Sequence, residues 1–105
     1  MIARTWNATA TTANANAYVG HFTTSVAPYL RTIVGHRGAW LLRRETGGQV
    51  EFLAVTLWDS LETIKTFAGP NPEVAIVEPE GRTALSSFDD FARHFEVAYS
   101  GFAGA

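Results

Sequence analysis

The sequence predicts a single α+β domain over residues 1–99, with the ferredoxin-like order β-α-β-β-α-β and an antiparallel sheet. Strand-like alternation at both ends of the chain encloses two helix-like segments and a central hairpin that turns at Gly47-Gly48. Both faces of that hairpin are apolar, whereas helices on one side can cover only one face. We therefore expect a homodimer that joins two sheets into a dimeric α+β barrel, followed by a flexible tail over residues 100–105.

The composition excludes several classes of function. Only 17% of the 105 residues are charged, which is below the ~25% of an average domain, and the formal net charge of −2 offers no basic surface for nucleic acid. Apolar runs stay far short of the ~20 residues that cross a membrane. The chain has no Cys, so disulfides and thiolate chemistry are excluded. No basic and apolar leader opens the chain, so we expect a cytoplasmic protein.

The first third of the chain predicts a strand followed by a long helix. Residues Ile2–Ala8 alternate and include β-branched and aromatic side chains, as a strand does. From Ala15 to Ile33 the apolar residues follow one stripe of an amphipathic helix, with Thr12 or Asn14 as its N-cap. Pro28 lacks a backbone N–H, so the helix should kink or restart there.

The hairpin of residues 37–58 has a register that its turn sets. A two-residue Gly47-Gly48 loop places Arg44 opposite Glu51, Leu42 opposite Leu53, Trp40 opposite Val55, and Arg37 opposite Trp58 as a cation–π pair. This register puts Trp40, Leu42, Leu53, Val55 and Leu57 on one face. The other face then carries Ala39, Leu41, Phe52, Ala54, Thr56 and Trp58.

The last third of the chain predicts short helices and a final strand. Asp59 or Ser60 caps a helix over residues 61–67, with Glu62 completing a capping box and Gly69-Pro70 ending the helix. Asn71-Pro72-Glu73 predicts the start of a second short helix that runs through Val77 and ends at Pro79. Residues 80–90 are expected to form a loop and Phe91–Tyr99 the last strand.

Residues along nearly the whole chain carry a resemblance to a known family. They are Met1–Trp6, Pro28-Tyr29, Gly35–Gly38, Phe52 with Thr56–Ser60, Phe67–Gly69, Pro79-Glu80 and His94–Val97. Through them the chain from Met1 to Tyr99 resembles the antibiotic biosynthesis monooxygenase family of the dimeric α+β barrel superfamily. That superfamily includes oxygenases, haem degraders, polyketide cyclases and members without known activity, so the resemblance is more specific for fold than for chemistry.

Two branches of the superfamily can be compared residue by residue. Haem degraders have an Asn on the first strand, which Asn7 matches, but Phe67 and Val77 stand at the positions of their Trp and iron-ligating His. Cofactor-free oxygenases of aromatic polyketides have a Trp at the end of the third strand, which Trp58 matches. Ala54 and Ile64 stand where those oxygenases have an Asn and a Tyr. The resemblance therefore implies no haem.

Cofactor-free oxygenation requires a protein to ionise a phenol or enol, hold the anion and exclude water. His94 is the candidate base and Arg4 the candidate anion-binding group, with Trp6, Asn7, Trp58, Phe67 and Glu96 as candidate substrate-binding residues. His94 and Glu96 on one strand face equally fit a solvated edge or an interface pair, and the Trp residues equally fit the core. The three His residues lack metal-ligand spacing.

The resemblance implies a cofactor-independent monooxygenase that acts on a small aromatic or polyketide-like molecule. The sequence has no phosphate loop or dinucleotide fingerprint, so no flavin, nicotinamide or other cofactor is expected. Two alternatives need the same apolar cavity: a non-catalytic dimeric barrel that binds a small hydrophobic ligand in a stress role, and a polyketide cyclase on the same scaffold.

Overall fold

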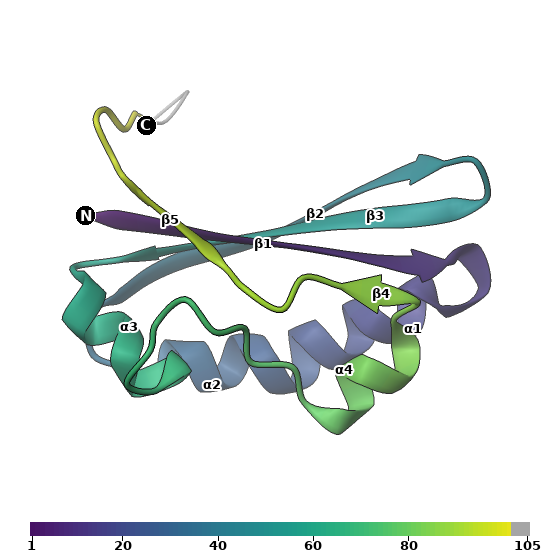
Figure 1. Cartoon of the computed structure of the whole chain (residues 1–105), viewed down its shortest axis with the longest axis horizontal. Coiled ribbons are helices and arrows are strands. Elements are labelled where there is room, and N and C mark those ends of the chain that lie inside the picture. Colours follow the sequence, from purple (N-terminus) through teal and green to yellow (C-terminus); the bar gives the residue numbers. More distant parts are fainter. Residues whose placement is uncertain (102–105) are drawn as a thin grey trace.

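A computed structural model describes residues 1–101 and confirms the predicted α+β architecture, in which all helices lie on one side of a single antiparallel sheet (Figure 1). The strand order is β2-β3-β1-β4, and β5 also pairs with β1. The predicted last strand, Phe91–Tyr99, is confirmed only over β5, and β4 forms within the segment that was expected to be a loop. The predicted tail lies outside the described residues from position 102 onward. The elements are β1 (Ile2–Thr11), α1 (Thr12–His21), the π-helical segment η1 (Phe22–Val26), α2 (Ala27–Arg31), β2 (His36–Thr46), β3 (Gln49–Trp58), α3 (Leu61–Ala68), α4 (Pro79–Ala84), β4 (Ser87–Phe88) and β5 (Arg93–Glu96).

The long first helix is interrupted before Pro28, as its sequence predicted. The regular α1 gives way to the π turn η1, and α2 begins with Pro28 in its first turn. Pro28 has no N–H to donate to an earlier carbonyl, so a regular helix cannot run through it with all its bonds. The predicted N-caps Thr12 and Asn14 are wrong, because the Thr11 side chain accepts the Asn14 N–H. The strand β1 runs three residues further than expected and delivers Thr11 to that position.

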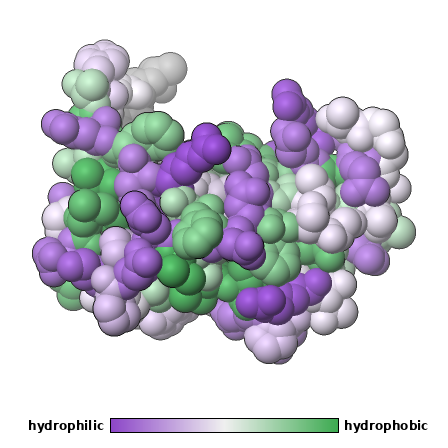
Figure 2. All heavy atoms as spheres, viewed as in Figure 1, coloured by the Kyte–Doolittle hydropathy of each residue, from purple (hydrophilic) through white to green (hydrophobic). Residues whose placement is uncertain are grey.

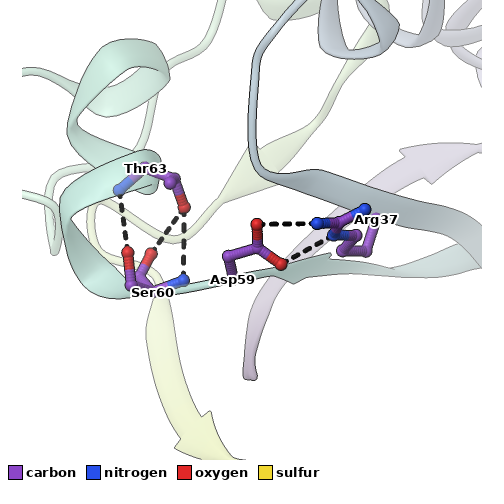
Figure 3. Close-up of polar contacts among 4 residues, drawn as sticks. All are labelled: Arg37, Asp59, Ser60 and Thr63. Atoms are coloured by element: carbon purple, nitrogen blue, oxygen red, sulfur yellow. Dashed lines mark hydrogen bonds and ion pairs between the residues drawn. The ribbon is translucent and has the colours of Figure 1, made fainter.

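The hairpin has the predicted register along most of its length, with Arg44 opposite Glu51, Leu42 opposite Leu53 and Trp40 opposite Val55. The predicted Arg37–Trp58 pair is wrong, because a register shift between His36 and Gly38 places His36 opposite Trp58. Arg37 instead forms a bidentate ion pair with Asp59, with Nε to Oδ1 at 2.6 Å and Nη2 to Oδ2 at 2.9 Å (Figure 3).

The cap of α3 differs from the prediction in one residue. Ser60 is the N-cap, and Thr63, not Glu62, completes the capping box through two 3.3 Å bonds (Figure 3). A capping box joins the cap to the third helical residue. With Asp59 held by Arg37, Ser60 takes the cap position and Thr63 becomes that residue.

The predicted helix over residues 71–77 is wrong. Asn71 accepts the Glu73 N–H in a turn, and the segment then runs extended beside the approach to β5, with a Val74–Phe91 bridge and an Ala92 N–H bond to the Glu73 carbonyl. The helix forms one segment later, as α4, where a loop was expected. Pro79 therefore starts a helix instead of ending one, which suits its fixed φ and missing N–H.

The two faces of the sheet have different surroundings. The helix-facing side holds the core, including the fully buried Trp58, Phe52 and Val50. On the other face, Trp40, Leu42 and Phe95 are 43%, 48% and 53% exposed. Figure 2 shows further apolar atoms at the surface between sheet and helices, on the side where the loop before α4 crosses the molecule (Figures 1 and 2).

Candidate functional site

A cavity of about 70 Å³ lies between the helix-facing side of the sheet and the helix layer. Strands β1 and β3 supply its floor, the α1–η1–α2 helix supplies one wall, and α3, the loop before α4 and α4 itself close it. Most of the lining is apolar, with a few polar groups among it. The lining residues are Arg4, Trp6, Tyr18, His21, Phe22, Val26, Leu30, Ala54, Thr56, Phe67, Ile76, Val77, Glu78 and Gly81.

Arg4 is a buried cation in this lining. The alternation of β1 turns Arg4 and Trp6 toward the helices, and Arg4 is only 6% exposed. Its Nη1 donates to the Pro72 carbonyl and its Nη2 donates to the Val74 carbonyl at 3.1 Å. Burial lowers the pKa of Arg4 to about 10, so the guanidinium remains charged at neutral pH. Among residues 1–101 no carboxylate forms an ion pair with it.

His94 lies directly behind Arg4, opposite it in the β1–β5 register. The His94 Nε2 is 3.0 Å from the Arg4 Nη1. A guanidinium can only donate, so Nε2 accepts and the imidazole is neutral, with its proton on Nδ1. Burial, and then the charge of Arg4, lower the pKa of His94, while Glu73 opposes this shift. His94 therefore supports Arg4 and is not among the residues that line the cavity.

Aromatic side chains flank Arg4 and Trp6. The Arg4 guanidinium lies 5.8 Å from the centre of the Phe67 ring, within cation–π range. The Trp6 ring packs 6.4 Å from the Tyr18 ring, and its Nε1 donates to the Asp89 carbonyl at 2.7 Å. The cavity thus has a cationic end at Arg4 and Phe67 and a second end at Tyr18.

Three predicted binding residues lie elsewhere. Asn7 is exposed, and strand alternation places it on the sheet face opposite Trp6. Trp58 is fully buried behind the cavity floor, where its Nε1 donates to the Thr56 Oγ1 at 2.8 Å. Glu96 is exposed at the end of β5, opposite Ile2. The structure therefore brings together Arg4, Trp6 and Phe67 in the cavity and places His94 behind them.

Among the lining residues that sequence reasoning missed, four matter for the chemistry of the cavity: Tyr18, His21, Glu78 and Gly81. Tyr18 falls within the apolar stripe of the predicted helix, and His21 is a polar residue off that stripe. Their spacing of three residues places both on one side of a helix, and that was the available signal. Glu78 and Gly81 reach the cavity only because α4 forms and packs against α1.

The described part of the chain holds neither a metal-binding cluster nor a membrane-spanning helix. Residues 1–101 contain no cluster of three or more His, Asp or Glu side chains arranged to hold a metal ion. No helix within that range is long and apolar enough to cross a membrane.

No family model matches the sequence, and no curated protein matches it significantly. Solved structures do match. A Bacillus cereus protein assigned as an antibiotic biosynthesis monooxygenase superposes with a TM-score of 0.67 at 18% identity, over 97% of each chain. SnoaB, a cofactor-independent oxygenase from Streptomyces nogalater, superposes with a TM-score of 0.62 at 13% identity, over 94% of this chain and 95% of SnoaB. The chain therefore has the fold of the antibiotic biosynthesis monooxygenases, as its resemblance predicted.

Proposed function

We propose that the chain is a member of the antibiotic biosynthesis monooxygenase family and a cofactor-independent monooxygenase that acts on a small aromatic or polyketide-like phenol or enol. The observation that carries this proposal is Arg4, a buried cation in an apolar cavity whose described partners are two carbonyls and a neutral imidazole. A buried charge is costly unless it is paired, so an anionic ligand oxygen would complete the site. The fold shared with SnoaB supports the same chemistry.

The reaction needs molecular oxygen and no other co-reactant. Removal of a proton from an anthrone-like substrate leaves an enolate, which gives one electron to O₂. The resulting radical pair joins to form a C–O bond. Protonation yields a hydroperoxide, and loss of water then leaves a ketone, so CH₂ and O₂ become C=O and H₂O. Arg4 stabilises the enolate oxygen through charge-assisted hydrogen bonds, and the Trp6 and Phe67 rings exclude water from it.

Substrate entry requires the cavity to widen. Its volume of about 70 Å³ is roughly half of the ~150 Å³ that holds one benzene ring. The wall at residues 76–78 has no helical or strand structure. We therefore expect this part of the wall to move aside with the smallest loss of hydrogen-bonding free energy.

We also propose that the functional unit is a homodimer. On the uncovered face of the sheet, Trp40 and Leu42 of β2 and Phe95 of β5 are exposed apolar side chains on either side of β3 and β1, and the same face of a second copy would match them in chemistry. A stable interface of this kind buries more than ~1,200 Å² in total.

Oxygen uptake with an anthrone-like substrate tests the proposed activity. The wild-type protein should consume one O₂ for each quinone formed, and Arg4→Met should lower turnover by ~10²–10³-fold because the enolate loses its counter-charge. Arg31→Met, which removes an exposed arginine on α2, is the matched control and should leave turnover unchanged. Substrate binding without oxygen uptake would favour the non-catalytic alternative, and conversion without oxygen would favour the cyclase.

A further inference from the structure

We propose that His21 is the proton acceptor of this cavity, and that His94 is a positioning residue for Arg4. This inference rests on the proposed function in one respect, namely that the ligand carries an acidic phenol or enol. It assigns the base to a helix residue of the cavity lining, instead of to the strand residue that the sequence suggested.

The three histidines have different surroundings. His36 packs edge-on against the Trp58 ring at 5.1 Å, and its buried Nε2 has no hydrogen-bond partner among residues 1–101. The Nε2 of His94 is occupied by the Arg4 guanidinium. His21 alone of the three lines the cavity. A general base needs an unoccupied lone pair within reach of the substrate, and His21 is the histidine that meets both conditions.

Helix α4 packs closely against the His21 ring through a glycine. Gly81 is buried against it, and a methyl group added at Gly81 would lie 3.4 Å from both Cδ2 and Nε2 of His21 and 3.5 Å from Cε1 of Tyr18. Any side chain larger than a methyl group would fill this space. The glycine therefore keeps its own side-chain atoms away from the Nε2 edge of His21 at the point where two helices meet.

Tyr18 completes this end of the cavity. Its ring centre lies 6.1 Å from that of His21, and burial raises the pKa of Tyr18 to about 12, so its hydroxyl remains a donor. Such a donor can orient a ligand oxygen beside the His21 ring. The titratable and charged groups on the elements packed around His21 are Tyr18 of α1, Arg4 of β1, Glu78 of the loop, and Glu80 and Arg82 of α4.

The proton balance is closed within the site. A ring nitrogen of His21 takes the proton of the substrate, and Arg4 faces the negative charge that remains. After O₂ has added, the imidazolium returns the proton to the peroxide oxygen. Glu78 is the acidic side chain among the lining residues of the same cavity.

The test uses binding of 4-cyanophenol, which changes its absorbance when it ionises. Affinity is measured about one pH unit below the pKa of the free probe and about one unit above it. His21→Gln should weaken binding at least ~10-fold below that pKa and less than ~2-fold above it, because the ionised probe needs no acceptor. His94→Gln is the matched control and should weaken binding equally at both pH values, since it disturbs Arg4.

A second measurement needs no variant. When wild-type protein binds the neutral probe, the ring-proton NMR signals of His21 should move to imidazolium positions while those of His94 stay at neutral positions. If His21→Gln binds the probe as tightly as the wild-type protein at both pH values, or if the His21 signal does not move, the assignment is overturned. An equal loss at both pH values would overturn it as well, because it indicates a structural role.

The role of His21 and the proposed oxygenase activity can be tested independently of each other. If wild-type protein consumes no oxygen but shows the pH split with the phenol, the activity fails and the role of His21 stands. If oxygen is consumed and His21→Gln keeps full turnover, the activity stands and the role of His21 fails.

Discussion

Replacement of Trp40 by Ala should weaken the proposed dimer strongly. Trp40 is 43% exposed on the uncovered sheet face, so truncation removes about 100 Å² of the ~250 Å² of a tryptophan from each protomer. In a symmetric interface the loss is about 200 Å² per dimer, equal to ~5 kcal/mol at ~25 cal/mol per Å². Since ~1.4 kcal/mol is tenfold, the Kd for dimerisation should rise by ~10³-fold.

Sedimentation velocity over a concentration series measures this change. The wild-type protein should remain dimeric at micromolar concentration, and the Trp40→Ala variant should dissociate within the same range. Val34→Ala is the control, because Val34 is 89% exposed but lies in the turn after α2 and not on the sheet face. A folded wild-type monomer at micromolar concentration, or a Trp40→Ala dimer as tight as wild type, would refute the reasoning.

Three further predictions concern stability and cofactors. Gly81→Ala should raise the free energy of unfolding by ~0.5–1 kcal/mol, because alanine favours helices, and should reduce affinity for a phenol, because the methyl group narrows the cavity beside His21. Denaturant titration measures the first effect and binding of the phenol measures the second. Unchanged affinity would contradict the geometry around Gly81. The free energy of unfolding should fall as the pH drops below ~6.5, because the folded protein holds the pKa of His36 and of His94 below the unfolded value, so the unfolded chain takes up more protons. In His94→Gln the free energy of unfolding should depend less steeply on pH, as denaturant titration at several pH values would show. An identical dependence in the variant and the wild type would count against this reasoning. The purified protein should be colourless and titration with haemin should give no sharp histidine-ligated Soret band, since Val77 stands at the ligand position and His94 is bonded to Arg4; a sharp band would make His94 the ligand to test.

The parts of the fold that depend on neighbouring residues were predictable from the sequence. The hairpin register follows from Gly47-Gly48, and the break near Pro28 follows from a missing N–H. The position of the last helix was not predictable, because Asn71-Pro72-Glu73 and Pro79-Glu80 both carry helix-start signals. Backbone pairing of the first segment with the approach to β5 decided between them.

The candidate site was predictable only along a strand. Arg4 and Trp6 share a face because a strand alternates, and His94 lies opposite Arg4 because the last strand, β5, pairs with the first strand, β1. Strand alternation also places Trp58 on the same sheet face as Arg4. A shared face does not say whether a side chain lines the cavity or packs in the core behind it, and Trp58 packs in the core. His21 and Gly81 meet through helix packing, which periodicity does not encode.

Arg4 donates hydrogen bonds to the carbonyls of Pro72 and Val74, in the loop before α4, so the time a ligand remains bound depends on the motion of that loop. The guanidinium that would hold an anion also holds the segment that closes the cavity over it. A ligand that orders Arg4 therefore slows its own escape, and dissociation has to wait for the loop to open. Amide hydrogen exchange would register this as slower exchange at Ala75 and Ala92, whose N–H groups bond the loop to the approach to β5.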